Sequence, residues 1–317
     1  MANAIGIDIG GTKIAGGVVD DDGRILAAGR TPTQASDPDA IIDDVVAMVR
    51  SLDDGSISSV GVAAPGFFDA TRSTVYYSPN IAWRNEPLQA RLAARLPDKV
   101  VTIENDANAA GWAEFRFGAG REERSMVMVT IGTGVGGAIV LDDRLLTGGF
   151  GSGAELGHMR LIPDGLPCGC GARGCVEQYC SGNALLRLAN EAADAGGDGA
   201  ALARARAAAG GLLNGHHVSA LLESGDPGAL RCLNELADLL GQALASMSAI
   251  LDPNIFVIGG GVAQAGDLLL DPVREAFLTH LPARGFHPEP SFSIAQLVND
   301  AGVIGAGDLA RSALVLG

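Results

Sequence analysis

The chain has 317 residues, of which 47% are hydrophobic, and its formal net charge is −15. This apolar content can form a large core and excludes a disordered protein, and the length indicates two domains. The acidic balance argues against nucleic acid and, more weakly, against any long polyanion, because such ligands are bound by lysine and arginine.

The N-terminal sequence lacks the basic and apolar stretches of a signal peptide. The longest uncharged run, residues 125–141, is shorter than the ~18 residues that span a membrane. Five cysteines without a secretion signal do not indicate a disulfide framework. We therefore expect a cytoplasmic protein with no membrane contact.

The first elements predicted along the chain are two strands joined by a glycine-rich turn, and this strand–turn–strand arrangement occurs twice. Residues 4–19 read AIGIDIGGTKIAGGVV, and residues 126–140 read MVMVTIGTGVGGAIV. A strand rather than a helix follows each turn, which excludes a Rossmann fingerprint and a Walker loop. We expect two hairpins whose turns expose backbone N–H groups, and hence two related halves.

Strands alternate with helices along the rest of the chain, which predicts an α/β fold. The strands are expected at 24–28, 60–63, 100–103 and 255–258, and the helices at 39–52, at 107–117, up to Asp252-Pro253, and at the C-terminus around 305–314. Residues 192–215 are interpreted as peripheral helix and loop. The expected domains are 1–115 with the C-terminal helix 301–317, and 116–300.

The two turns and a third glycine cluster after a strand favour nucleotide binding over ordinary tight hairpins. Glycines let the backbone approach an anion, a threonine offers a hydroxyl, a lysine offers a charge, and Asp8 can contact Mg²⁺ through water. The residues concerned are Asp8, Gly10, Gly11, Thr12, Lys13, Thr133, Gly134, Gly260 and Gly261.

Asp106 stands where a strand meets a helix, within the sequence Glu104-Asn105-Asp106-Ala107-Asn108. A carboxylate held there can accept a proton from an attacking hydroxyl during phosphoryl transfer. An aspartate before an alanine-rich helix is equally an N-cap. The position by itself leaves both interpretations open.

One histidine and three clustered cysteines, each cysteine beside a glycine, supply the Cys₃His set of a structural zinc site. These ligands are His158, Cys168, Cys170 and Cys175. The alternative, buried cysteines and a core histidine, is disfavoured by the spacing. Cys180 and Cys232 lie outside the pattern and are assigned as structural.

The motifs at 8–13, 131–137 and 105–108 resemble those of the ROK sugar kinases, and the resemblance covers essentially the whole chain. It implies two actin-like ATPase (ribonuclease H-like) domains with a ligand cleft between them. Within the family the chain looks most like bacterial ATP-dependent glucokinases, which implies glucose and Mg²⁺-ATP as substrates, structural Zn²⁺, and a homodimer or homotetramer.

The resemblance also implies residue roles. Asp106 is then the general base, and Gly260 and Gly261 lie near the adenosine. The implied sugar contacts are Gly66, Asn80, Asn105, Asp106, Glu155, His158 and Glu177. From the sequence alone, the glutamates are equally well explained as solvated side chains and the 66 and 80 segments as simple turns.

Several alternatives share these motifs. They are kinases for N-acetylmannosamine, N-acetylglucosamine or fructose, a polyphosphate-dependent glucokinase, and a non-enzymatic sugar-responsive regulator. The regulator is disfavoured because such proteins carry a helix-turn-helix ahead of the sugar domain, whereas the first motif here begins at Asp8.

Overall fold

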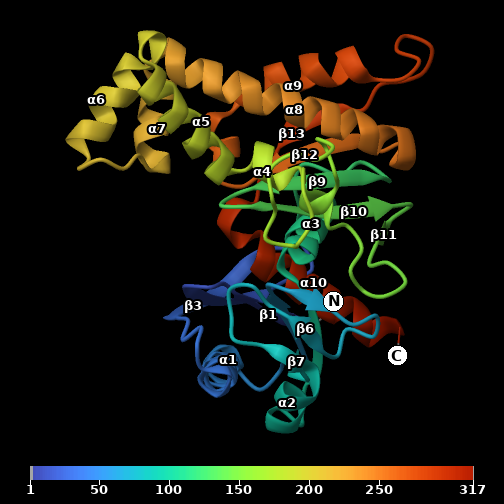
Figure 1. Ribbon diagram of the computed structural model, residues 1–317. Coiled ribbons are helices and arrows are strands. Elements are labelled where there is room, and N and C mark those ends of the chain that lie inside the picture. Colours follow the sequence, from blue (N-terminus) through green and yellow to red (C-terminus); the bar gives the residue numbers. More distant parts are fainter. Residues whose placement is uncertain (1–2, 317) are drawn as a thin grey trace. The chain divides into compact units, whose positions relative to one another are not determined.

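The computed structural model describes residues 3–316 and contains two five-stranded sheets and one small three-stranded sheet (Figure 1). In spatial order, the first large sheet has β3 (Ile25–Pro32), β2 (Lys13–Val19), β1 (Ala4–Ile9), β4 (Ser59–Ala64) and β8 (Val100–Asn105). The second has β11 (Arg144–Leu145), β10 (Val135–Leu141), β9 (Met126–Ile131), β12 (Ile255–Gly259) and β13 (Ser291–Ile294). The small sheet has β5 (Phe67–Phe68), β6 (Val75–Tyr77) and β7 (Arg84–Glu86).

The two large sheets have the same strand order. In each, the earliest strand is central, the next two lie on one side of it, and the last two lie on the other. β1 pairs antiparallel with β2 and parallel with β4, and β9 likewise pairs parallel with β12. The predicted relation between the two halves therefore extends from the glycine-rich turns to the whole sheet.

Ten α-helices occur within the described residues. They are α1 (Pro38–Leu52), α2 (Leu88–Arg95), α3 (Asp106–Phe117), α4 (Glu177–Cys180), α5 (Gly182–Ala195), α6 (Ala200–Ala208), α7 (Gly215–Glu223), α8 (Pro227–Leu251), α9 (Asp267–His280) and α10 (Ala301–Leu316). The α/β prediction is confirmed. None of these helices combines the length and apolarity needed to cross a membrane.

The chain divides into two compact units. Unit 1 contains residues up to 124, 138–154 and those from 296 onward, and unit 2 contains 125–137 and 155–295. The domain ranges expected from the sequence stay a prediction, and Met1, Ala2 and Gly317 within them lie outside the described residues.

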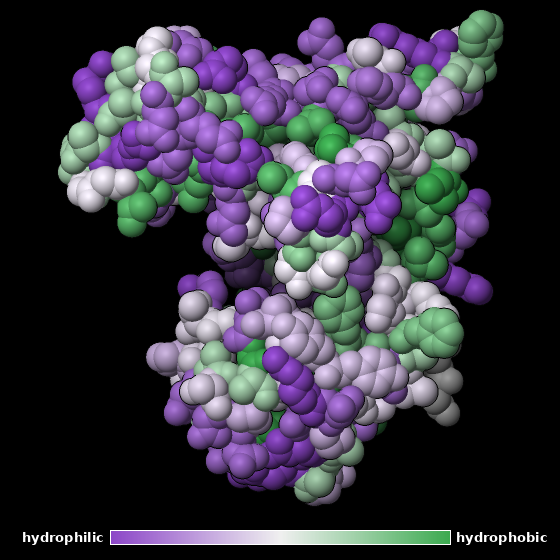
Figure 2. All heavy atoms as spheres, viewed as in Figure 1, coloured by the Kyte–Doolittle hydropathy of each residue, from purple (hydrophilic) through white to green (hydrophobic). Residues whose placement is uncertain are grey.

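Unit 1 is built by packing α10 directly on the backbone of the first sheet. A Cβ on Gly6 of β1 would lie 1.9 Å from the Val303 oxygen, and one on Gly61 of β4 would lie 1.8 Å from the Ala306 oxygen. Only glycine allows this approach, so the strand sequence determines where the helix lies. On the visible face of unit 1, α1 and α2 present mainly hydrophilic side chains (Figure 2).

Most predicted boundaries move by a few residues. The third strand was predicted at 24–28 but extends to Pro32, and the helix predicted at 107–117 begins at Asp106. The C-terminal helix spans 301–316 rather than 305–314 alone. The small sheet was missed because its strands are only two or three residues long and carry no periodic signal.

Candidate active site

The first glycine-rich turn joins β1 to β2 in unit 1 and lies against Asn80. The Gly10 N–H donates to the Lys13 carbonyl at 2.9 Å, and Thr33 Oγ1 donates to the Gly10 carbonyl at 2.7 Å. A Cβ on Gly11 would lie 3.4 Å from Asn80 Cβ. Thr12 and Lys13 are exposed. The turn is therefore held from inside and presents its polar groups outward beside Asn80.

Asp8 precedes this turn, and its carboxyl lies in a confined environment. Burial, then the charge of Asp106, raises the pKa of Asp8 from 3.8 to about 6, while Lys13 acts in the opposite direction. Gly302 of α10 leaves room for this carboxyl, because a Cβ there would lie 2.7 Å from Asp8 Cγ. A buried carboxyl whose ionisation is opposed by burial and by a nearby negative charge forms a setting that favours a cation.

Asp106 is the first residue of α3, and it does not cap that helix. The cap is Asn105, whose Oδ1 accepts the Asn108 N–H at 3.0 Å. Asp106 Oδ1 accepts only the adjacent Ala107 N–H, at 2.9 Å, among the hydrogen bonds of the described residues. Burial raises the pKa of the Asp106 carboxyl, although the residue as a whole is only half-buried. The capping interpretation thus applies to Asn105, and the catalytic role of Asp106 stays a prediction.

Asn105 also joins the strand end to the segment at Gly66. Its Nδ2 donates to the Gly66 carbonyl at 3.1 Å. Gly66 has a φ of +137°, and a Cβ there would lie 2.5 Å from the Tyr77 carbonyl oxygen, so glycine is required. The hydrogen bonds and close approaches of unit 1 thus link Gly66 to Asn105 and Asn80 to the first turn, and the charge of Asp106 acts on Asp8.

The second glycine-rich turn, in unit 2, is held by Glu177. Glu177 Oε2 accepts the Val135 N–H at 3.1 Å, and a Cβ on Gly134 would lie 2.3 Å from the same oxygen. Its other oxygen, Oε1, lies 4.0 Å from Cys168 Sγ. Glu177 therefore connects the turn to the cysteine cluster, a role that sequence reasoning did not assign to it.

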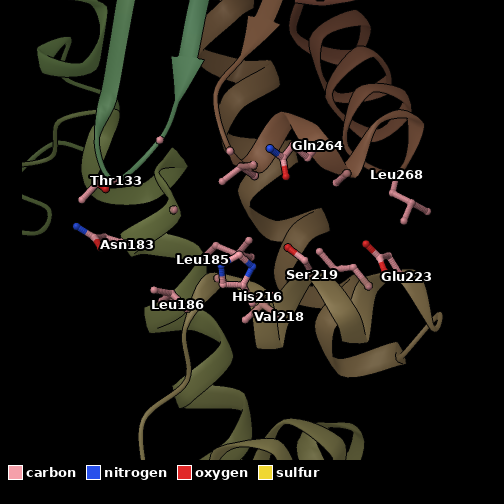
Figure 3. A pocket seen from close by; sticks show the side chains of 17 residues that line it. Thr133, Asn183, Leu185, Leu186, His216, Val218, Ser219, Glu223, Gln264 and Leu268 are labelled. Carbon is pink, nitrogen blue, oxygen red and sulfur yellow. The ribbon is translucent and has the colours of Figure 1, made fainter. Parts of the chain in front are cut away.

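The third glycine cluster lies beside the second turn and opens onto a cavity of about 560 Å³ within unit 2. A Cβ on Gly260 would lie 2.5 Å from the Ile131 oxygen, and Gly261 and Thr133 line the cavity. Figure 3 shows side chains of α7 pointing into the cavity from one side, and Gln264 and Leu268 from the other. The α7 side chains are His216, Ser219 and Glu223.

The histidine and three cysteines predicted as zinc ligands come together in unit 2. The ligand atoms of His158, Cys168, Cys170 and Cys175 all lie within 4.8 Å of one another. The sulfurs of Cys170 and Cys175 are 3.7 Å apart, and His158 Nδ1 is 3.7 Å from Cys168 Sγ. Two Zn–S bonds of ~2.3 Å at a tetrahedral angle separate their sulfurs by ~3.8 Å, so the donor set fits zinc.

The profile of the ROK family matches residues 4–313. The chain belongs to the ROK family. The glucokinase of Streptomyces coelicolor is 45% identical over 98% of this chain and 98% of its own length. The structure of a ROK family glucokinase from Streptomyces griseus, in complex with glucose and AMPPNP, superposes with a TM-score of 0.85 at 43% identity, covering 98% of this chain and 99% of that one.

A more distant ROK relative, the N-acetyl-D-glucosamine kinase of Salmonella typhimurium, is 34% identical over 81% of this chain and 84% of its own length. Membership of the family confirms the predicted two-domain actin-like ATPase fold. The roles expected for single residues stay predictions.

Sequence reasoning missed two groups of residues in this ROK protein. The cavity wall formed by α7 directly follows the stretch interpreted as peripheral, and its only signal is helical spacing after the Asn214 cap. The second group is Arg72 and Glu104, an ion pair of 3.0 Å beside Asn105. Glu104 precedes the Asn-Asp motif in sequence, but nothing in the sequence pairs it with an arginine 32 positions earlier.

Proposed function

We propose that this chain is an ATP-dependent glucokinase that transfers the γ-phosphoryl group of ATP to the 6-hydroxyl of glucose. The observation that carries the proposal is the junction of β8 and α3. Asn105 caps the helix, so the carboxyl of Asp106 remains available beside Asp8 and the first glycine-rich turn. The full-length similarity to bacterial glucokinases supports glucose as the acceptor.

The oxygen of the sugar 6-hydroxyl attacks the γ-phosphorus of ATP, and Asp106 accepts the hydroxyl proton. ADP leaves with the electrons of the broken P–O bond. A general base works best when its pKa lies near the operating pH, and the raised pKa of Asp106 moves in that direction. Asn80, Asn105 and the Gly66 segment bind other sugar hydroxyls in unit 1. Glu155, His158 and Glu177 are proposed as sugar contacts in unit 2.

The triphosphate binds the glycine-rich turns, with Asp8, Gly10, Gly11, Thr12 and Lys13 in unit 1. In unit 2, Thr133 and Gly134 bind phosphate, and Gly260 and Gly261 lie near the adenosine. Mg²⁺, when bound, neutralises phosphate charge, and Asp8 suits it because its carboxyl is costly to ionise without a cation. Lys13 is exposed and supplies a second positive charge.

The cavity lining favours a nucleotide over polyphosphate as the donor. No lysine or arginine occurs among the described residues that line the 560 Å³ cavity, and many of those residues are apolar. An apolar cavity with a few polar groups is typical of a site for a flat base, whereas a polyanion requires cations. Thr133 belongs to the proposed phosphate turn and lines this cavity together with Gly261, which supports a nucleotide as the donor.

We also propose that His158, Cys168, Cys170 and Cys175 bind one structural zinc ion that orders residues 158–177. The sulfur separations support this assignment. Zinc content measured on protein purified without added metal tests it, with one ion per chain expected.

A cytoplasmic location agrees with five free cysteines, since thiols stay reduced there. A homodimer or homotetramer is expected from the family, and light scattering tests it.

A coupled assay of sugar phosphate formation, which does not depend on the identity of the donor, tests the main proposal. Six sugars, including glucose, fructose, N-acetylglucosamine and N-acetylmannosamine, are each combined with ATP, GTP and polyphosphate. Glucose with ATP should give the highest kcat/KM. Absence of turnover with glucose and ATP would refute the proposal, and a higher kcat/KM with polyphosphate would refute the assignment of the cavity.

A further inference from the structure

Arg72 and Glu104 form a largely buried ion pair at the end of β8, directly before the residues proposed to bind and deprotonate the sugar. Their side chains are 15% and 10% exposed, and Arg72 Nε lies 3.0 Å from Glu104 Oε2. The free energy needed to remove two charges from water is about as large as the free energy gained from their attraction, so such a pair contributes little net stability. Stability alone therefore does not explain why the pair is present.

The second oxygen of Glu104 organises the start of α3. Glu104 Oε1 accepts the Asn105 N–H at 2.8 Å and Asn108 Nδ2 at 3.0 Å. Asn105 in turn caps α3 and reaches Gly66. The position of the Glu104 carboxylate thus sets the orientation of Asn105 and of the helical turn that begins with Asp106.

Arg72 and Glu104 both line a cavity of about 190 Å³, so packing does not enclose the ion pair on every side. The fixed point is Arg72, whose guanidinium forms two directed hydrogen bonds. Nε donates to Glu104, and Nη1 donates to the Gly151 carbonyl at 2.7 Å. The planar fork of arginine can hold two acceptors at once, which a lysine ammonium does not reproduce.

The backbone at Arg72 supports the same conclusion. Its φ is +53°, a left-handed conformation that favours glycine or asparagine over a long side chain. The turn is held by Asp69, whose Oδ1 accepts the Ser73 N–H at 2.7 Å and the Thr74 N–H at 2.8 Å. A long side chain in this conformation is uncommon, which agrees with a specific role for the Arg72 guanidinium.

We propose that Arg72 is a positioning residue for sugar phosphorylation: through Glu104 it holds Asn105 and the first turn of α3, and with it Asp106, in the reactive orientation. This inference rests on the proposed function. It assigns no contact with substrate to Arg72 or Glu104. Their effect on the reaction passes entirely through Asn105 and Asp106.

The test compares Arg72→Met with Lys99→Met. Lys99 is the matched control, because it forms an ion pair of similar burial with Asp53 (7% and 14% exposed) just before β8 begins. Arg72→Met should lower kcat with saturating glucose by ~10- to 100-fold, since small misplacements of reacting groups cost rates of this size. Lys99→Met should lower the melting temperature but leave the kcat of the folded enzyme unchanged.

The double variant Arg72→Met/Glu104→Gln separates positioning from general damage. A neutral amide leaves no unpaired buried charge but restores no bond to Arg72, so kcat should stay as low as in Arg72→Met. Recovery to the wild-type kcat would trace the loss to the unpaired charge and overturn the positioning role. Where Arg72→Met does not fold, Arg72→Lys replaces it, with a smaller decrease of kcat expected. A kcat in folded Arg72→Met or Arg72→Lys equal to that of the wild type would overturn the proposal.

Hydrogen exchange provides a readout that does not depend on the reaction. In peptides covering residues 100–110, the Asn105 and Asn108 amides should exchange faster in Arg72→Met than in Lys99→Met, because both lose support when Glu104 moves. Unchanged exchange would overturn the positioning role. Inactivity of the wild type with glucose and ATP would instead refute the proposed function, and the exchange data would still decide the role of Arg72.

Discussion

Asp106→Asn separates the two possible roles of the β8–α3 junction. Asparagine is close in shape to aspartate, and its Oδ1 can still accept the Ala107 N–H. It cannot take a proton from the sugar. Loss of a general base typically costs ~10²–10⁴-fold in rate, which corresponds to ~3–5 kcal/mol of transition-state stabilisation. We expect kcat to fall by this factor while glucose binding, measured by calorimetry, changes little.

The same substitution should not destabilise the protein. Loss of an N-cap costs ~0.5–2 kcal/mol, but the cap of α3 is Asn105, so Asp106→Asn leaves it intact. The change in the Asp8 pKa from 3.8 to about 6 corresponds to ~3 kcal/mol, and the charge of Asp106 is its second cause after burial. Removing that charge therefore raises the free energy of unfolding at pH 8 by less than this amount.

The assay combines steady-state kinetics with urea unfolding of the ligand-free protein at pH 8. Asn105→Ala is the control for capping and should lower the free energy of unfolding by ~1 kcal/mol. The reasoning is refuted if Asp106→Asn retains a tenth of the wild-type kcat, or if it destabilises the protein as much as Asn105→Ala does.

Three further predictions concern pH, metal and the glycines. The Asp8 carboxyl keeps its proton to a higher pH in the native protein than in the unfolded one. Its contribution to stability is therefore present below pH 4 and is lost between about pH 4 and 6. Urea unfolding should show that the free energy of unfolding of Asp8→Asn depends less on pH in this window than that of the wild type. Burial, then Cys168 and Cys170, raises the pKa of the Cys175 thiol to about 12, so zinc uptake by the metal-free protein at pH 7.5 should release at least one proton. Calorimetry in buffers of different ionisation enthalpy measures this release, and a buffer-independent enthalpy would contradict it. Gly134→Ala should lower the melting temperature because its Cβ would displace Glu177 Oε2 from the Val135 N–H, whereas Gly132→Ala, with open space around its Cβ, should not. Equal losses in the two variants would show that this hydrogen bond does not matter.

The sequence by itself determined the features that depend on local chemistry. The alternation of strands and helices predicted the α/β class, and the two glycine-rich hairpins predicted a duplicated half, because β-branched strands and glycine turns favour those conformations wherever they occur. The Cys₃His cluster was also predictable, since three of its ligands lie within eight positions and the glycines between them permit the turns.

Only the tertiary structure decided which residue at the β8–α3 junction caps the helix. Asn105 and Asp106 are both good caps by composition, and the choice depends on where β8 ends in its parallel pairing with β4, at Ala64 and Asn105. The partners of Glu104 and Glu177 were likewise unpredictable, because they lie 32 and 42 positions away in the chain. Pairings at such distances are set by the packing of whole elements, and local sequence preferences do not encode them.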